Sequence, residues 1–306
     1  MVSYPFGGWT SFFKAIGWSI AFLLIGVSFS IIFGVGNIFL LERSGVVGIG
    51  DGTNLPVLLL LQGVSTLAGF GLATWIIAHR VMRLRARTIG WASGRAARRG
   101  FLLGLLCGVV PAVAALTLGA AAGGAAWVRS NGTIGTYVLV VLQTILFLAP
   151  AAFSEEILFR GLPLVLLDRS LGRGAAILSY SACVFALAHA RNPDVTPLAI
   201  ANIALAGILL GLVFYTAGGI WASFGAHLGW NATLAASGAP VSGLPLPIPL
   251  LDYRPGHPDW LAGGRFGPEG GILAGIALIG ASVVAARWAI RDNYSTGAAE
   301  TLRRVA

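Results

Sequence analysis

The chain has 306 residues, of which 57% are hydrophobic and only 10% are charged, and its net charge is +9. Soluble domains carry about 25% charged residues, so this composition excludes a soluble globular enzyme, a disordered chain and a disulfide scaffold. The two cysteines, Cys107 and Cys183, lie in apolar runs without the spacing of a zinc or redox motif. We therefore predict an all-α, polytopic integral membrane protein.

The predicted elements are apolar helices that cross the bilayer. Such a helix needs about 20 mostly apolar residues. By this criterion the sequence contains about eight spans, at residues 15–41, 55–78, 101–128, 136–166, 174–190, 197–217, 220–236 and 271–289. The fifth and the seventh span are shorter than the others.

The spans and their connections divide the chain into four parts. Residues 1–135 hold three N-terminal spans, with an arginine-rich loop at residues 79–100. Residues 136–236 form a central core. Residues 237–270 contain seven prolines, a density that resists helix formation, so we expect a connecting loop there. Residues 271–306 hold the last span and a tail.

The positive charge indicates the topology. The loop at residues 79–100 contains seven arginines and no acidic residue, and short loops of this kind stay in the cytoplasm. Eight spans then place both termini in the cytoplasm. We expect the arginines to contact anionic lipid and not nucleic acid. The arginine-, alanine- and glycine-rich composition favours a bacterial inner membrane as the location.

Ionisable side chains inside the spans are the candidate functional residues. Each costs at least about 2.5–3.5 kcal/mol to insert near the bilayer centre, and such residues therefore mark functional sites. They form three motifs: Glu155-Glu156-x-x-x-Arg160 in the fourth span, Phe185-x-x-x-His189 in the fifth, and His227-x-x-x-Asn231 in the seventh.

Helical spacing assigns these residues to different faces. Glu156 and Arg160 are four positions apart and can pair. Glu155 is turned by about 100° from Glu156, so it is free to face another partner. His227 and Asn231 share a face. A carboxylate, imidazoles and an amide can thus form a polar pocket with the base and oxyanion donors that hydrolysis needs. The alternative is structural, with the ion pair locking two helices and each histidine bonding a nearby carbonyl.

The three motifs in this order resemble the family of CAAX proteases and bacteriocin-processing enzymes (CPBP), over residues 136–236. The resemblance implies an intramembrane glutamic endopeptidase. It implies that Glu155 is the general base that activates water, that His189 orients this water, and that His227 and Asn231 donate hydrogen bonds to the oxyanion. Glu156, Arg160 and Phe185 are then supporting residues.

The resemblance leaves the metal and the substrate open. Glu155, His189 and His227 could bind zinc as a two-His, one-Glu set, but the chain has no H-E-x-x-H motif, and we expect a mechanism without a cofactor. The expected partners are the bilayer and a membrane-associated protein or peptide, for which prenylated CAAX peptides are the eukaryotic example. The alternative functions are a non-proteolytic scaffold or bacteriocin-immunity protein on the same fold, and a small transporter. We expect the site in the cytoplasmic half of the bundle.

Overall fold

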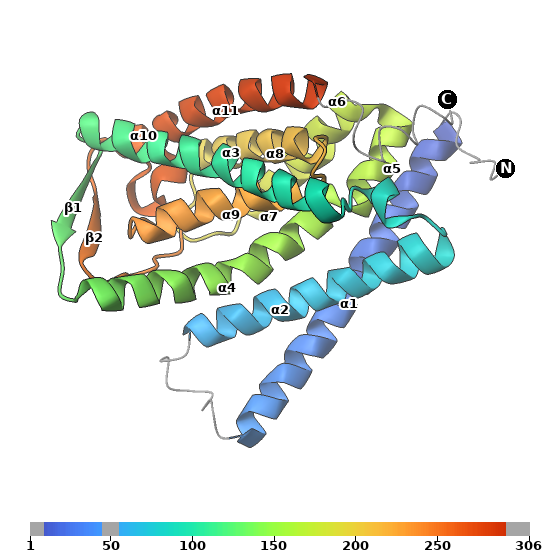
Figure 1. Cartoon of the computed structure of the whole chain (residues 1–306), viewed down its shortest axis with the longest axis horizontal. Coiled ribbons are helices and arrows are strands. Elements are labelled where there is room, and N and C mark those ends of the chain that lie inside the picture. The colour runs from blue at the N-terminus through green and yellow to red at the C-terminus, as the bar shows by residue number, and fades with distance from the viewer. Residues whose placement is uncertain (1–8, 45–54, 292–306) are drawn as a thin grey trace.

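The computed structural model describes residues 9–44 and 55–291, and this part of the chain is a bundle of helices with one small sheet (Figure 1). The prediction of an all-α membrane protein is confirmed. The α-helices are α1 (Trp9–Ser44), α2 (Leu55–Thr74), α3 (Gly94–Ala121), α4 (Ile134–Arg160), α5 (Leu162–Leu171), α6 (Arg173–Ala176), α7 (Phe185–Ala188), α8 (Pro197–Phe214), α9 (Ile220–Ala236), α10 (Asp259–Ala262) and α11 (Ile272–Arg291). The expected cytoplasmic tail after Arg291 lies outside the described residues.

Six helices in the described ranges are long and apolar enough to cross a membrane. They are Ser11–Leu41, Val57–Val81, Gly94–Ala121, Ile134–Leu171, Pro197–Phe214 and Ile272–Arg291. The fifth and seventh predicted spans are also helical, but they are shorter, at Arg173–Ala188 and Ile220–Ala236. Helix α9 packs against α3, α4 and α8, so the bundle and not lipid covers most of it. These two short helices carry the second and third motifs.

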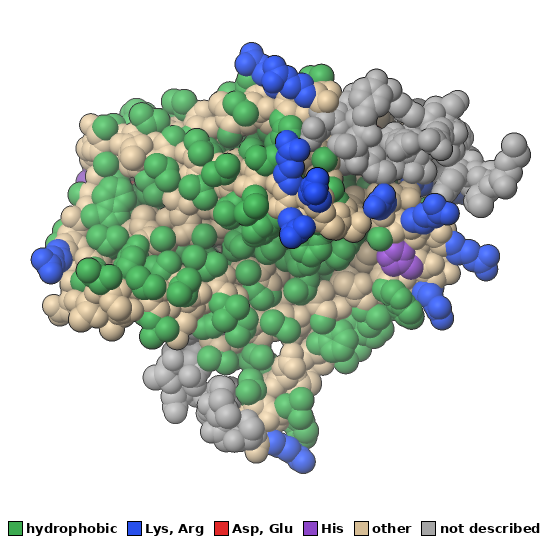
Figure 2. Space-filling view, viewed as in Figure 1, with side chains coloured by type: hydrophobic (Ala, Val, Ile, Leu, Met, Phe, Trp, Pro, Cys, Tyr) green, Lys and Arg blue, Asp and Glu red, His purple; other side chains and the backbone are tan. Residues whose placement is uncertain are grey.

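The outer surface of the bundle is apolar, as contact with the lipid chains of a bilayer requires. Large apolar side chains such as Leu106, Leu142 and Val284 are exposed. Figure 2 shows hydrophobic side chains over most of the visible flank, with most of the lysine and arginine side chains toward the end of the bundle where α1 begins and α2 ends. The arginine-rich segment lies at this end, and β1 and β2 lie at the opposite end (Figure 1).

Close contact between α3 and α9 fixes the position of the third motif. A Cβ atom at Gly104 would overlap the carbonyl oxygen of Ala222, and one at Gly108 would overlap that of Ala226. Small residues permit such backbone contact between helices in lipid. Helix α9 therefore has little freedom to move relative to α3.

Two predicted spans differ from the structure at their ends. The third predicted span includes residues 122–128, but α3 ends at Ala121, and Ala125–Arg129 is strand β1. This strand pairs antiparallel with β2 (Leu251–Pro255), because the apolar side chains there pack across the sheet; Trp127 and Tyr253 lie with their ring centroids 5.6 Å apart. The fourth predicted span breaks at Gly161, where α4 ends and α5 begins with a proline in its first turn.

The proline-rich segment at residues 237–270 is a folded part of the bundle. It contains β2, α10 and two 3₁₀ turns, at Gly264–Phe266 and Pro268–Gly270. The indole of Trp127 donates a hydrogen bond to the carbonyl of Ser237 (2.7 Å). Val241 and Phe266 are buried. This segment therefore contributes walls to the interior next to α9.

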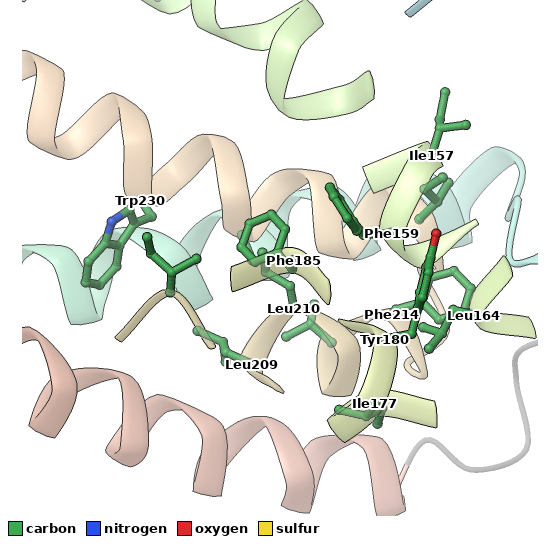
Figure 3. Close-up of a cluster of buried hydrophobic side chains, with 14 of the residues drawn as sticks. Ile157, Phe159, Leu164, Ile177, Tyr180, Phe185, Leu209, Leu210, Phe214 and Trp230 are labelled. Carbon is green, nitrogen blue, oxygen red and sulfur yellow. The ribbon is translucent and has the colours of Figure 1, made fainter. Parts of the chain in front are cut away.

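Apolar side chains pack around the helices that carry the motifs (Figure 3). Phe159 of α4 meets Phe185 of α7 edge to face, with ring centroids 5.1 Å apart, and Tyr180 packs against Phe159 from the π-helical turn Ile177–Val184. Burial of this size stabilises a site by about 1.5–3 kcal/mol per large side chain. The cluster holds α4 and α7 in register, which places their polar residues at a common depth.

Candidate active site

The ion pair expected from helical spacing is formed and fully buried. Nη1 of Arg160 lies 3.1 Å from Oε1 of Glu156, and neither side chain is exposed. The Nε–H of Arg160 donates to the hydroxyl of Ser181 (3.1 Å), and its guanidinium lies 4.2 Å from the centroid of the Phe185 ring. Phe185 therefore supports Arg160 through a cation–π contact, and the two motifs are joined by direct contacts.

Glu156 also contacts α9, which the sequence did not indicate. Its Oε1 lies 2.7 Å from Nδ1 of His227, and its Oε2 accepts a hydrogen bond from Ser223. The carboxylate thus has three partners from two helices. Because Nδ1 of His227 is bound to Glu156, Nε2 of the same ring is left to face the opposite side, toward Glu155.

Glu155 has no such partners. Its Oε2 atom is buried and has no hydrogen-bond partner among the described residues. It lies 3.7 Å from Nε2 of His189 and 3.8 Å from Nε2 of His227. These distances exceed those of direct hydrogen bonds. The side chain of Glu155 as a whole is 32% exposed, so water can reach its carboxyl group. The ring of His189 is oriented by a contact of 2.8 Å between its Nδ1 and the carbonyl of Phe185.

One cavity of about 710 Å³ contains all four residues expected to be catalytic. Glu155, His189, His227 and Asn231 line it, together with α2, α4 and residues 241–247. Along α4 the lining runs from Glu155 back to Val140, and along α2 from Thr66 back to Leu59.

The cavity therefore extends away from the arginine-rich segment, which follows α2. The sequence predicts a site in the cytoplasmic half of the bundle, which is the half that carries the arginine-rich segment. The structure places the open volume on the other side of the motif residues, because α2 and residues 241–247 complete its walls there.

Asn231 lies one turn after His227, and its carboxamide has no hydrogen-bond partner within residues 9–44 and 55–291. It lines the large cavity and also a chamber of about 40 Å³ on the other side of the histidines. This chamber is shared by His189, His227, Trp230 and Glu269. A volume of this size holds two or three waters, since one needs about 10–15 Å³. The histidines and Asn231 form a partition between the two spaces.

Glu269 is a site residue that sequence reasoning missed. Its Oε1 accepts a hydrogen bond from the indole of Trp230 (3.1 Å), and its Oε2 accepts one from the backbone N–H of Ser242. Burial raises the pKa of its carboxyl above the ordinary value, while the two N–H donors and the nearby His189 and His227 act in the opposite direction. The only signal in the sequence is an isolated acid in a proline-rich segment, which gives no indication of its partners.

The described part of the chain contains no group of three or more His, Cys, Asp or Glu side chains arranged to hold a metal ion. Glu155, His189 and His227, the alternative zinc ligands, are the residues closest to such an arrangement, and they are separated by the distances given above.

Residues 137–233 match a family model described as "Type II CAAX prenyl endopeptidase Rce1-like". The matched segment runs from α4 to α9 and includes all three motifs. The match covers about a third of the chain and confirms the resemblance of this segment to the CAAX-protease family. The chain has no match among the curated proteins or the solved structures.

Proposed function

We propose that the protein is an intramembrane endopeptidase in which Glu155 activates water for attack on a peptide bond. The observation that carries this proposal is the environment of Glu155. Its buried Oε2 lacks a protein partner, faces the Nε2 atoms of two histidines at 3.7 and 3.8 Å, and lies at the wall of a large cavity. A carboxylate in this position can take a proton from a water that the imidazoles orient.

Each motif residue then has one role. A water held between Glu155 and His189 attacks the carbonyl carbon, and Glu155 accepts its proton. His227 and Asn231 donate hydrogen bonds to the oxygen that becomes negative. When the C–N bond breaks, Glu155 returns the proton to the leaving nitrogen, so the products are a carboxylic acid and an amine. Phe185 contacts Arg160, Arg160 pairs with Glu156, and Glu156 positions His227.

His227 can donate from both ring nitrogens only when it is protonated. Glu156 lies 2.7 Å from Nδ1 and accepts the hydrogen bond on that side, so Nε2 is the nitrogen that can face the oxyanion. Two adjacent glutamates therefore have different roles: Glu156 is a buried structural partner, and Glu155 faces the reacting groups. This mechanism uses no metal ion.

The proposed substrate is a membrane-associated protein or peptide, with prenylated CAAX peptides as one class. The proposed location is a bacterial inner membrane with both termini in the cytoplasm. The seven arginines of residues 79–100 support this orientation, since α3 begins within that segment and carries Arg95 and Arg98 into its first turns.

The test is cleavage of a peptide pool by purified protein in lipid nanodiscs, read by mass spectrometry. The pool combines tryptic peptides of bacterial membrane proteins with farnesylated and unmodified CAAX peptides. We expect cleavage by the wild-type protein, with and without a chelator, and none by the Glu155→Gln variant. Equal product from both proteins would contradict the role of Glu155, and loss of cleavage with chelator would contradict the metal-free mechanism. A wild-type protein that cleaves no peptide would favour the scaffold.

A further inference from the structure

Residues 244–247, with the sequence Leu-Pro-Leu-Pro, form part of the wall of the large cavity. We call these four residues the strap. They line the same space as Glu155 and His189, and they lie in irregular, non-helical backbone. The strap comes from the segment that connects α9 to α11, so it approaches the motif residues from outside the family-matched part of the chain.

The turn before the strap is held by contacts on several sides. Val241 and Leu244 exchange two backbone hydrogen bonds, of 3.0 and 2.9 Å. The N–H of Ser242 donates to Glu269, and its carbonyl accepts a hydrogen bond from the side chain of Asn192 (3.0 Å). Both backbone polar groups of Ser242 are therefore fixed by side chains, and the strap starts from a rigid position.

The backbone of Leu246 is unpaired. Neither its N–H nor its carbonyl has a hydrogen-bond partner among the described residues, although it lines a cavity inside a membrane protein. An unpaired N–H and C=O that face a cavity can bond to water or to a ligand that displaces the water. The position is therefore suited to a partner that brings its own donor and acceptor.

The prolines on both sides of Leu246 indicate what kind of partner fits. In extended backbone, alternate residues present their N–H and C=O to the same side. Pro245 and Pro247 have no N–H, so on the side away from the partner they offer only carbonyl groups, and a second strand cannot form a complete ladder with them. One extended peptide can pair with Leu246, and a continuous sheet cannot form.

We propose that the strap binds the substrate as an extended peptide, with Leu246 exchanging backbone hydrogen bonds with one substrate residue while the bond to be cleaved lies beside Glu155. This inference rests on the proposed function. Main-chain pairing of this kind gives affinity that is independent of side-chain identity, and neighbouring pockets supply the selectivity. Here apolar walls from Phe147 and Leu148 of α4 lie in the same cavity.

The alternative is that the strap only fills space. The two cases differ in what they require of Leu246: pairing requires its backbone N–H, and filling space requires its side-chain volume. Leu246→Pro removes the N–H and part of the side-chain volume, and Leu246→Ala keeps the N–H but loses even more of the volume. These two substitutions form a matched pair.

The experiment measures binding separately from cleavage. A fluorescein-labelled, farnesylated CAAX peptide is titrated against the Glu155→Gln protein in nanodiscs, and the Kd is read by fluorescence anisotropy. We expect Leu246→Pro to raise the Kd about fivefold to tenfold, the effect of losing one backbone hydrogen bond, and Leu246→Ala, which keeps the N–H, to change it less than twofold. As a control, both variants should unfold at the same temperature as the protein that keeps Leu246, which would show that the bundle is intact.

A second measurement uses the peptide. Methylation of its backbone nitrogens, one at a time, should weaken binding at one position or at alternate positions only. Uniform effects along the peptide, a Kd for Leu246→Ala as high as that for Leu246→Pro, or the absence of saturable binding would each overturn the strap proposal. None of these outcomes bears on the role of Glu155, because cleavage by the Glu155→Gln protein is what would overturn the proposed hydrolysis.

Discussion

The buried pair of Glu156 and Arg160 gives the sharpest prediction about stability. Glu156→Gln keeps the shape of the side chain and removes its charge. Arg160 is fully buried and keeps its contacts with Ser181 and Phe185, but it loses its 3.1 Å ion pair. Removing one partner of a buried pair costs about 3–5 kcal/mol because the other charge stays uncompensated. Since 1 kcal/mol shifts the Tm of a large domain by about 2–4 °C, we expect a fall on the order of 10 °C.

The assay is thermal unfolding of purified protein in one detergent, with Glu155→Gln as the matched control. Glu155 is one residue away, is 32% exposed and has no hydrogen bond at Oε2, so its substitution should leave Tm nearly unchanged. The double variant Glu156→Gln, Arg160→Met removes both charges and should recover much of the lost stability. Equal Tm values for the two single variants would refute the distinction between a structural and a reacting glutamate.

Three further substitutions test other parts of the site. Asn231→Ala should lower kcat about 10²–10³-fold with little change in KM, because one oxyanion donor is lost; an unchanged kcat would exclude that role. Glu269→Gln leaves one of the two N–H donors facing the NH2 group of the new side chain. We therefore expect the free energy of unfolding to fall by about 1–3 kcal/mol in a denaturation experiment. An unchanged free energy would mean that this carboxylate does not anchor the turn. Gly108→Leu should displace α9, lower the free energy of unfolding by about 1–3 kcal/mol and abolish cleavage. The control is Gly280→Leu on α11, which has open space around it and should be tolerated. Equal effects of the two substitutions would contradict the packing argument.

Much of the candidate site could be predicted because α-helical spacing is a local property. Residues four positions apart share a face wherever the helix lies, so the pairing of Glu156 with Arg160 follows from the sequence. The proximity of Phe185 and His189, whose ring centroids are 4.6 Å apart, follows in the same way. A common polar pocket was inferred from the ionisable side chains inside the spans, and the family resemblance supported it, but spacing within single helices does not determine how helices pack.

The contacts that were missed join segments far apart in the sequence. The contact between Glu156 and His227 depends on the crossing of α4 and α9, and the position of Glu269 depends on how residues 237–270 fold back onto the bundle. Proline density correctly indicated a segment without long helices. It gave no information on tertiary contacts, and so a wall of the cavity was interpreted as a simple connection.

The most direct test of the account is the kcat of the Glu155→Gln protein on a peptide that the wild-type protein cleaves, measured at a temperature where both proteins are folded. General base catalysis contributes about 10²–10⁴-fold, so we predict a fall of that size with Tm unchanged. A kcat within a factor of about ten of the wild-type value would show that Glu155 is not the base.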